Sequence, residues 1–252
     1  MANVLSYRIG DPRSPQLPLD RIAALGIRFV EISVPLDGAG QQIRGLLKQH
    51  SLAAASMDAP CPLADDKVFG IFERSAELAA ELGAKALFTS VHAGEIPLDT
   101  VYSRMRRIGD TVAKRNILVA METHPDLCQN GGAAAKTVAG INHPNVGVNY
   151  DTANVYYYNQ NTNTVEEVKK IAHKVVSVHL KDTMGGYHDG NFPDFGLGVV
   201  DFAGVFRVLN GVGFSGPFTM ELEGPAHSAG DPAAMEKHVA ACVNHLKGLG
   251  VV

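Results

Sequence analysis

The sequence predicts an α/β fold in which eight parallel strands alternate with helices and close into one (β/α)8 barrel. Eight short runs rich in β-forming residues are each followed by a helical pattern. Their starts recur at about the ~30-residue spacing of a strand–helix–strand unit. The length of 252 residues is typical of one such barrel, and no Ser- or Gly-rich linker divides the chain. We therefore expect a single domain over residues 1–252.

The expected strands form a regular series along the chain. In order they are Val4–Ile9, Phe29–Val34, Leu52–Met57, Ala86–His92, Ile117–His124, Val146–Asp151, Val175–Asp182 and Pro217–Glu223. Eight such units in a chain of this size favour a closed barrel over an open, doubly wound sheet.

Two of the expected helices carry clear boundary signals in the middle of the chain. Val68–Leu82 places apolar side chains at helical spacing, and Gly83 then provides a C-terminal stop. The run Thr164-Val165-Glu166-Glu167 matches a capping box that would open a helix over Val165–Ala172. Both signals place a helix between two expected strands, as the barrel requires.

The last helix and the longest loop are also marked. Asp231 supplies an N-cap, and Pro232 occupies the first position of a helix over Pro232–Leu249. The loop Thr183–Val199 is long and rich in glycine. Loops of that length in a compact domain are often functional.

Composition excludes several classes of function. Hydrophobic residues make up 46% and charged residues 19%, which supports a sizeable core. A net charge of −4 argues against nucleic acid as a partner, because phosphate binding needs a basic surface. No uncharged apolar run is long enough to span a membrane, and no signal peptide is apparent. Three widely spaced cysteines suit free thiols in a reducing compartment, so we expect a cytoplasmic enzyme.

The strongest functional signal is the alternation within four strands. Successive strand residues point to opposite faces, so each strand has two phases. One phase is apolar and fits under the helices, whereas the other becomes polar towards the C-terminal end. Active sites in this fold lie at that end of the barrel. The polar phases therefore aim four side chains at one small volume: Glu122, Asp151, His179 and Glu221.

Three carboxylates and one imidazole at such close range indicate a divalent metal ion. The carboxylates would repel one another unless a cation joined them. A mixed set of oxygen and nitrogen ligands suits Mn²⁺ best in our interpretation, with Zn²⁺, Co²⁺ and Fe²⁺ as alternatives and Mg²⁺ less suited to imidazole. Each residue alone has a simpler explanation, such as a solvated Glu122, a hydrogen-bonded core His179 or an Asp151 that caps the next segment. Their joint placement on four strand ends favours the metal.

Other polar residues are candidates for the same pocket. His92, at the end of the fourth expected strand, and His124 are expected to contact substrate or support the ligands, and His188 in the long loop could close over substrate. Lys181 follows His179 in phase and could stabilise an enolate oxygen, or else pair with a carboxylate such as Glu223. Glu31 is expected either to bind hydroxyls or to pair with Arg8. The run Tyr156-Tyr157-Tyr158 is interpreted as packing, because consecutive residues cannot all face one way.

The metal-binding motifs resemble those of the xylose-isomerase-like TIM-barrel superfamily of sugar (phosphate) isomerases and epimerases. The resemblance covers most of the chain and depends on four short motifs in a specific order. They are Met121-Glu122-Thr123-His124, Asn149-Tyr150-Asp151-Thr152, Val178-His179-Leu180-Lys181-Asp182 and Gly216-Pro217-Phe218-Thr219-Met220-Glu221. Members similar to ketose 3-epimerases hold one Mn²⁺ or similar ion, which implies the same role for the four residues above. The resemblance also implies that Glu122 and Glu221 act as acid and base.

Three positions depart from the pattern of those epimerases. Asn154 stands where they have a histidine three residues after the metal-binding aspartate, so we expect Asn154 to contact substrate in its place. Cys128 replaces a substrate-binding glutamate, and Gly185 replaces a substrate-binding arginine. The fold and the metal site therefore carry over better than the substrate.

The sequence thus predicts a metal-dependent isomerase or epimerase for a small sugar or sugar phosphate. Proton abstraction next to a metal-bound carbonyl would give an enediolate intermediate. The alternative in the same superfamily is a lyase that dehydrates a keto-cyclitol or keto-sugar. A DNA-repair endonuclease similar to AP endonucleases and a non-catalytic sugar-binding barrel are the remaining alternatives. The endonuclease would need a basic groove, which the net charge of this chain argues against. This chain also has Asp58, rather than a histidine, at the end of its third expected strand. A homo-oligomer remains open.

Overall fold

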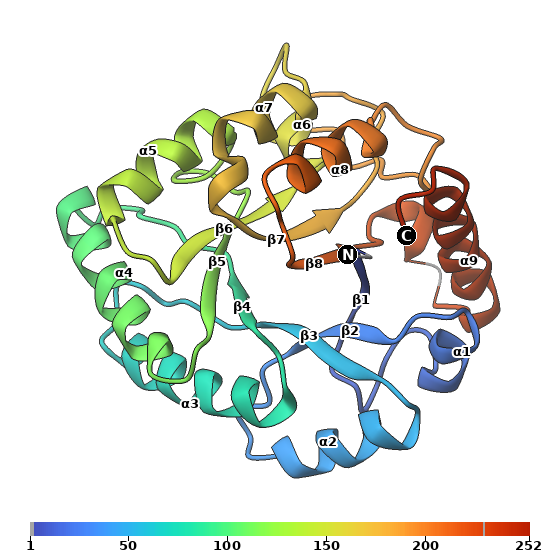
Figure 1. Cartoon of the computed structure of the whole chain (residues 1–252), viewed down its shortest axis with the longest axis horizontal. Coiled ribbons are helices and arrows are strands. Elements are labelled where there is room, and N and C mark those ends of the chain that lie inside the picture. The colour runs from blue at the N-terminus through green and yellow to red at the C-terminus, as the bar shows by residue number, and fades with distance from the viewer. Residues whose placement is uncertain (1–2, 229) are drawn as a thin grey trace.

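The computed structural model describes residues 3–228 and 230–252, and its eight parallel strands close into a barrel. Each strand pairs with the next, and β8 pairs with β1 to complete the circle. Figure 1 looks along the barrel, with the strands at the centre and the helices around the rim. The predicted (β/α)8 fold is confirmed.

The elements have the following bounds. The strands are β1 Val4–Gly10, β2 Phe29–Ser33, β3 Ala53–Asp58, β4 Ala86–Thr89, β5 Leu118–Glu122, β6 Val146–Asp151, β7 Val175–Leu180 and β8 Pro217–Met220. The α-helices are α1 Leu19–Ala24, α2 Gly40–Gln49, α3 Lys67–Leu82, α4 Leu98–Ala113, α5 Gly131–Ile141, α6 Asn154–Tyr158, α7 Thr164–Ile171, α8 Phe202–Gly211 and α9 Pro232–Gly248. Two short 3-10 helices are η1 Ala172–Lys174 and η2 Pro225–His227.

Helix boundaries follow the sequence signals with one exception. Gly83 ends α3 in the left-handed conformation at φ 83°, and the Asp231 side chain caps α9 by accepting from the amide of Ala233. The predicted capping box of α7 is wrong, because Asn163 caps this helix by accepting from two amides of its first turn. The hydroxyl of Thr164 instead lies 3.0 Å from the buried hydroxyl of Tyr150.

The two phases of the strands separate an apolar layer from a polar interior. Apolar strand residues such as Val119, Val178 and Met220 are buried in the core beneath the helices. The opposite phase supplies fully buried polar side chains to the interior, where Ser177 donates to Asn149 at 2.7 Å. The barrel interior is therefore partly polar, although the hydroxyls of Ser6 and Thr219 and the amide nitrogen of Asn149 have no hydrogen-bond partner within the described part of the chain. The polar phase continues to the carboxyl ends of the strands, where Glu122 and Asp151 lie.

Among the described residues, no helix is both long and apolar enough to cross a membrane. The three cysteines are free, as expected, with Cys128 and Cys242 buried and Cys61 half-buried.

Candidate metal centre and active site

Four strands deliver the four expected metal ligands to one place. Glu122 ends β5, Asp151 ends β6, His179 lies in β7 and Glu221 follows β8 directly. One ligand atom from each lies within 4.8 Å of the others, and all four residues are buried. Closure of the barrel is what brings them together, because β5 and β8 are separated by two intervening strands.

The imidazole of His179 is oriented from across the barrel. Its Nε2 lies 2.9 Å from Oε1 of Glu31, a fully buried residue of β2, which itself accepts from Ser56 at 2.6 Å. Its Nδ1 lies 3.2 Å from Glu122 and 3.3 Å from Glu221. A carboxylate that holds the outer nitrogen of a metal-binding histidine fixes the ring and its tautomer. The guanidinium of Arg8 also lies 3.8 Å from Oε1 of Glu31, which is one of the two roles expected for this residue, and the contact with His179 comes in addition.

Asp151 and Glu122 are each held by one carboxylate oxygen. Oδ1 of Asp151 accepts from the amides of Ala153 and Asn154 at 2.8 Å each. Oε2 of Glu122 accepts from the hydroxyl of Ser90 at 2.7 Å and lies 2.8 Å from Nδ1 of His124. These contacts aim the remaining oxygen of each residue at the cluster.

Two basic side chains, Lys181 and Arg8, contact carboxylates in and around the cluster. The ammonium of Lys181 lies 3.1 Å from Oδ2 of Asp151, 2.7 Å from Oε2 of Glu221 and 2.6 Å from Oε1 of Glu223. The guanidinium of Arg8 contacts Oε1 of Glu221 and lies 2.9 Å from Asp58. Both expected roles of Lys181 are therefore compatible with its position, and its pairing with Glu223 is present.

The donor set fits a divalent cation. Oδ2 of Asp151 and Oε2 of Glu221 are buried and lack a hydrogen-bond partner within the described part of the chain, although Lys181 lies within ion-pair distance of both. An unsatisfied buried carboxylate oxygen is costly. An ion among these oxygens and Nδ1 of His179 would satisfy them, and N/O sets of this kind suit Mn²⁺, Zn²⁺, Co²⁺ or Fe²⁺.

The charges of the cluster are strongly coupled. Burial raises the pKa of Asp151 to about 7, because the attraction of Lys181 only partly offsets the loss of water and the nearby Glu221. Burial also opposes the charge of Glu122, but hydrogen bonds from His124 and His179 outweigh it and lower its pKa to about 2. Burial would lower the pKa of His179, yet the charges of Glu221 and Glu31 raise it well above its ordinary value. The raised pKa values of Asp151 and His179 show that these residues hold protons that balance the nearby carboxylates, and a bound cation would take the place of those protons.

A cavity of about 540 Å³ opens directly above the cluster. Three of the five expected substrate contacts, His124, Asn154 and Lys181, line this cavity. The other lining residues, which the sequence did not indicate as part of the site, are Arg8, Asp58, Phe88, Ser90, Tyr157, Tyr158, Gly190, Phe192, Glu223 and Gly224. Asp58 could have been recognised, because it shares the inward phase of β3 with Ser56.

His92 and His188 do not line the cavity. β4 ends at Thr89, earlier than expected, so His92 lies beyond the strand with an exposed side chain whose Nδ1 is 2.7 Å from the carbonyl of Pro125. His188 stacks beside Tyr157, with ring centroids 5.1 Å apart. Each instead lies beside a residue that lines the cavity. The His92 ring is 5.9 Å from that of His124, and His188 is next to Tyr157.

The packing interpretation of the three consecutive tyrosines holds only for the first. Tyr156 is buried, and its hydroxyl accepts from the amide of Thr164 at 3.3 Å. Tyr157 and Tyr158 line the cavity, and the Tyr158 ring lies 5.3 Å from that of His124. The short helix α6 turns the second and third side chains towards the opening, which a strand-like alternation would not do.

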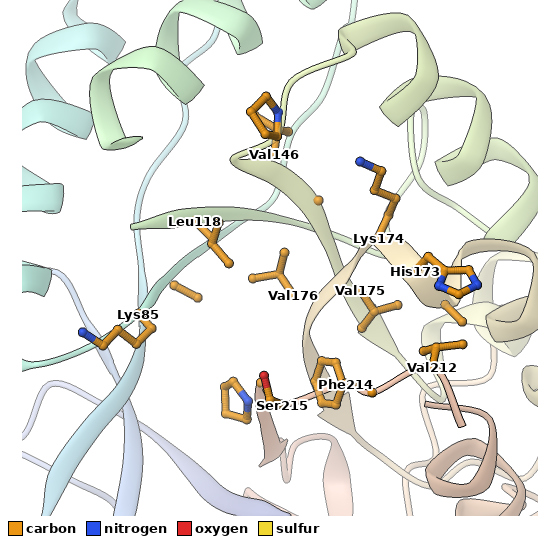
Figure 2. Close-up of a pocket in the computed structure, with 17 residues that line it drawn as sticks. Lys85, Leu118, Val146, His173, Lys174, Val175, Val176, Val212, Phe214 and Ser215 are labelled. Carbon is orange, nitrogen blue, oxygen red and sulfur yellow. The ribbon is translucent and has the colours of Figure 1, made fainter. Parts of the chain in front are cut away.

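Another cavity, of about 430 Å³, lies at the opposite end of the barrel (Figure 2). It is formed where several strands begin, and Figure 2 shows Leu118, Val175, Val176 and Phe214 around it. Its described lining contains no carboxylate, and its ionisable side chains are Lys85, His173 and Lys174. Because chemistry in this fold occurs at the carboxyl ends of the strands, the cavity above the metal ligands is the candidate active site.

The chain is similar in sequence to two sugar epimerases. A ketose 3-epimerase from Arthrobacter globiformis is 24% identical over 204 residues, which cover 72% of this chain and 67% of that protein. L-ribulose-5-phosphate 3-epimerase UlaE from Escherichia coli is 45% identical over 60 residues, which cover 24% of this chain and only 20% of that protein.

Solved structures agree on the fold. A xylose isomerase domain protein from Planctomyces limnophilus superposes with a TM-score of 0.80 at 18% identity, covering 99% of this chain and 98% of that chain. The family model described as xylose isomerase-like TIM barrel matches residues 19–243. The chain therefore belongs to the xylose isomerase-like TIM-barrel family.

Proposed function

We propose that the chain acts as one barrel domain, residues 1–252, and is a metal-dependent isomerase or epimerase of a ketose. The observation that carries this proposal is the convergence of Glu122, Asp151, His179 and Glu221 at the floor of the cavity. Among the described residues, two of their buried carboxylate oxygens have no hydrogen-bond partner, although both form an ion pair with Lys181. These four residues would hold the ion, with Mn²⁺ as the best candidate. The relationship to a ketose 3-epimerase supports the choice of substrate class.

The ion, when bound, would polarise the carbonyl of the substrate and stabilise the negative charge that develops on its oxygen. The remaining chemistry is proton transfer by protein side chains. Carbon acids beside a polarised carbonyl can be deprotonated by a carboxylate that is held within hydrogen-bonding reach. Glu122 and Glu221 are the carboxylates of the cluster that also line the cavity.

Glu122 and Glu221 are placed to act from different sides of a substrate. They come from β5 and from the residue after β8, which are separated by β6 and β7 in the closed sheet. One glutamate would remove the proton from a carbon beside the carbonyl, and the other would return a proton to the opposite face. Inversion at one carbon requires two such groups, so the arrangement favours epimerisation.

Each proposed acid–base group has its own supporting residues. Ser90 and His124 contact Oε2 of Glu122, and His124 also borders the cavity. Arg8 and Lys181 hold Glu221. We propose that His124, Asn154 and Lys181 bind oxygen atoms of the substrate, because each lines the cavity and offers an N–H donor or an amide.

The charge of the cavity favours an unphosphorylated sugar. Asp58, Glu122, Glu221 and Glu223 line it, against the two permanent cations Arg8 and Lys181. Each cation already contacts at least two carboxylates. A phosphate group would meet this negative wall without a free positive partner. Three aromatic side chains, Tyr157, Tyr158 and Phe192, instead offer apolar surface to the carbon face of a neutral sugar.

A substrate panel tests the proposal. Protein reconstituted with Mn²⁺ would be incubated with ketopentoses, ketohexoses and their phosphate esters, and the products separated by chromatography. The proposal expects a new epimer or aldose from an unphosphorylated ketose, no product after chelation, and none with Glu221→Gln. Turnover of the phosphate esters alone would contradict the assigned substrate. Release of water from a keto-cyclitol, without any epimer, would identify a lyase instead.

A further inference from the structure

A second cluster of metal-binding side chains lies outside the proposed active site. It contains Asp194 in the loop after β7, His227 at the end of η2 and His238 in α9. One potential ligand atom from each lies within 4.8 Å of the others. None of the three residues lines the cavity above the first cluster.

The buried His227 has oxygen acceptors on both ring nitrogens. Its Nδ1 lies 2.9 Å from the backbone carbonyl of Glu223, and its Nε2 lies 2.9 Å from Oδ1 of Asp194. A carbonyl can only accept, so Nδ1 carries a hydrogen and donates it there, which leaves Nε2 to face the carboxylate of Asp194. The side chain of His227 is 1% exposed, so protein groups rather than water surround this contact.

His238 approaches the same carboxylate from another direction. Its Nδ1 lies 2.9 and 3.0 Å from the two oxygens of Asp194, and its ring is nearly perpendicular to that of His227, at 84° and 5.0 Å. Its side chain is 32% exposed, so a water molecule could reach the site from this side. Two imidazole nitrogens and one carboxylate, with room for water, form a common donor set of tetrahedral Zn²⁺.

We propose that Asp194, His227 and His238 bind a second divalent ion of the Zn²⁺ class. The ion would be held by Nε2 of His227 and a carboxylate oxygen of Asp194, while the Glu223 carbonyl holds the other nitrogen of His227, as outer partners of metal-binding histidines do. Its ligands come from three separate segments, so it ties the long loop after β7 to η2 and α9. That loop carries Phe192, which borders the cavity only two residues before Asp194. The second ion therefore fixes one wall of the cavity.

Zinc content of matched variants separates the two sites. Asp151→Asn would disable the first site and His238→Gln the second, and the double variant would disable both. Each protein would be stripped with chelator, titrated with Zn²⁺ and analysed by mass spectrometry after removal of free metal. We expect two ions in the parent, one in each single variant and none in the double variant. His245→Gln, two turns further along α9, serves as the control and keeps both ions.

Cobalt provides a second readout. In the Asp151→Asn background, Co²⁺ should give the visible absorption of a tetrahedral site, and His238→Gln should abolish it. His238→Gln should also lower the zinc affinity of this site by at least ~10–100-fold, because this is the cost of losing even an outer partner of a ligand. A folded Asp151→Asn protein that binds no zinc would overturn the second site and leave an ion pair between His227 and Asp194. Zinc retained in full by the double variant would overturn it as well. Failure of the first site alone leaves the His238 comparison intact.

Discussion

Glu31 holds Nε2 of His179 at 2.9 Å from the opposite side of the barrel and so directs Nδ1 towards Glu122 and Glu221. β2 and β7 are not neighbours in the sheet, so this contact crosses the barrel interior. The candidate metal centre therefore includes a buried carboxylate–histidine pair in addition to its four proposed ligands.

Glu31→Gln should weaken metal binding without removing a ligand. An amide at this position holds the His179 ring less strongly, and loss of an outer partner typically costs ~10–100-fold in metal affinity. Isothermal titration with Mn²⁺ measures the change. Ser56→Ala, which removes only the hydroxyl that supports Glu31, should have a smaller effect in the same direction. Equal affinity in Glu31→Gln and the parent would mean that His179 needs no support from β2.

Removal of the ion should lower thermal stability. A ligand that binds only the folded state adds about 2.7 kcal/mol at a free concentration of 100 Kd. For a chain of this size that corresponds to about 5–10 °C in Tm. Calorimetry before and after chelation, with Mn²⁺ or Co²⁺ added back, measures the shift. Glu122→Gln, Asp151→Asn, His179→Ala and Glu221→Gln should each reduce it, and an unchanged Tm in stripped protein would argue against a preformed site.

Lys181→Met should lower the stability of the metal-free protein but raise its affinity for Mn²⁺. Lys181 is buried among Asp151, Glu221 and Glu223, so its removal leaves their charges unbalanced. Removing one partner of a buried ion pair typically costs about 3–5 kcal/mol. The stripped variant should melt earlier than the stripped parent, but bind Mn²⁺ more tightly.

Lys169→Met provides the matched control for this comparison. Lys169 pairs with Glu166 at 2.6 Å on α7, where both side chains are exposed. Exposed pairs contribute about 0–1 kcal/mol, so little change is expected. Equal effects of the two substitutions would show that Lys181 does not balance the charge of the cluster.

Asp58 should make stability depend on pH in a defined window. Burial raises the pKa of this carboxyl to about 6 from 3.8, despite the opposing attraction of Arg8. The folded state therefore binds the proton more tightly than the unfolded state. The contribution of this proton to the free energy of unfolding is fully present below pH 3.8 and is lost as the pH rises through about 6. Relative to Asp58→Asn, the parent should lose stability between pH 4 and 6 in chemical denaturation, and parallel curves would contradict the raised pKa.

The sequence could predict that the four proposed ligands lie together, because period-two alternation within a strand directly reports which side chains share a face. Glu122, Asp151 and His179 lie within or at the ends of regular strands, so their phase was readable. The pairing of Glu31 with His179 was not readable, because it depends on which strands face each other across the closed barrel. The expectation that His92 lines the cavity differs from the structure, because β4 ends at Thr89 and the sequence does not show where this strand ends.

Other details depended on competition between neighbouring residues. Asn163 and Thr164 are both good N-caps, and the structure uses Asn163 while Thr164 packs inward against Tyr150. Tyr157 and Tyr158 line the cavity because α6 follows β6 almost immediately and turns them towards the opening. Nothing in the local sequence pattern marked Phe192, since its place depends on the fold of the long loop.

Hydrogen exchange on the substrate shows whether Glu122 and Glu221 carry protons between the substrate and solvent. If Glu122 and Glu221 carry protons, the carbon beside the carbonyl must lose its hydrogen, and a carboxyl proton can exchange with solvent before it is returned. The Mn²⁺-loaded protein and a substrate ketose would be followed by NMR in D₂O, with Glu122→Gln and Glu221→Gln as matched variants. We expect deuterium at that carbon in the product. In either variant, the rate of exchange should fall far more than the affinity for the substrate. Turnover without deuterium would show a hydride shift and would contradict the proposed role of both glutamates.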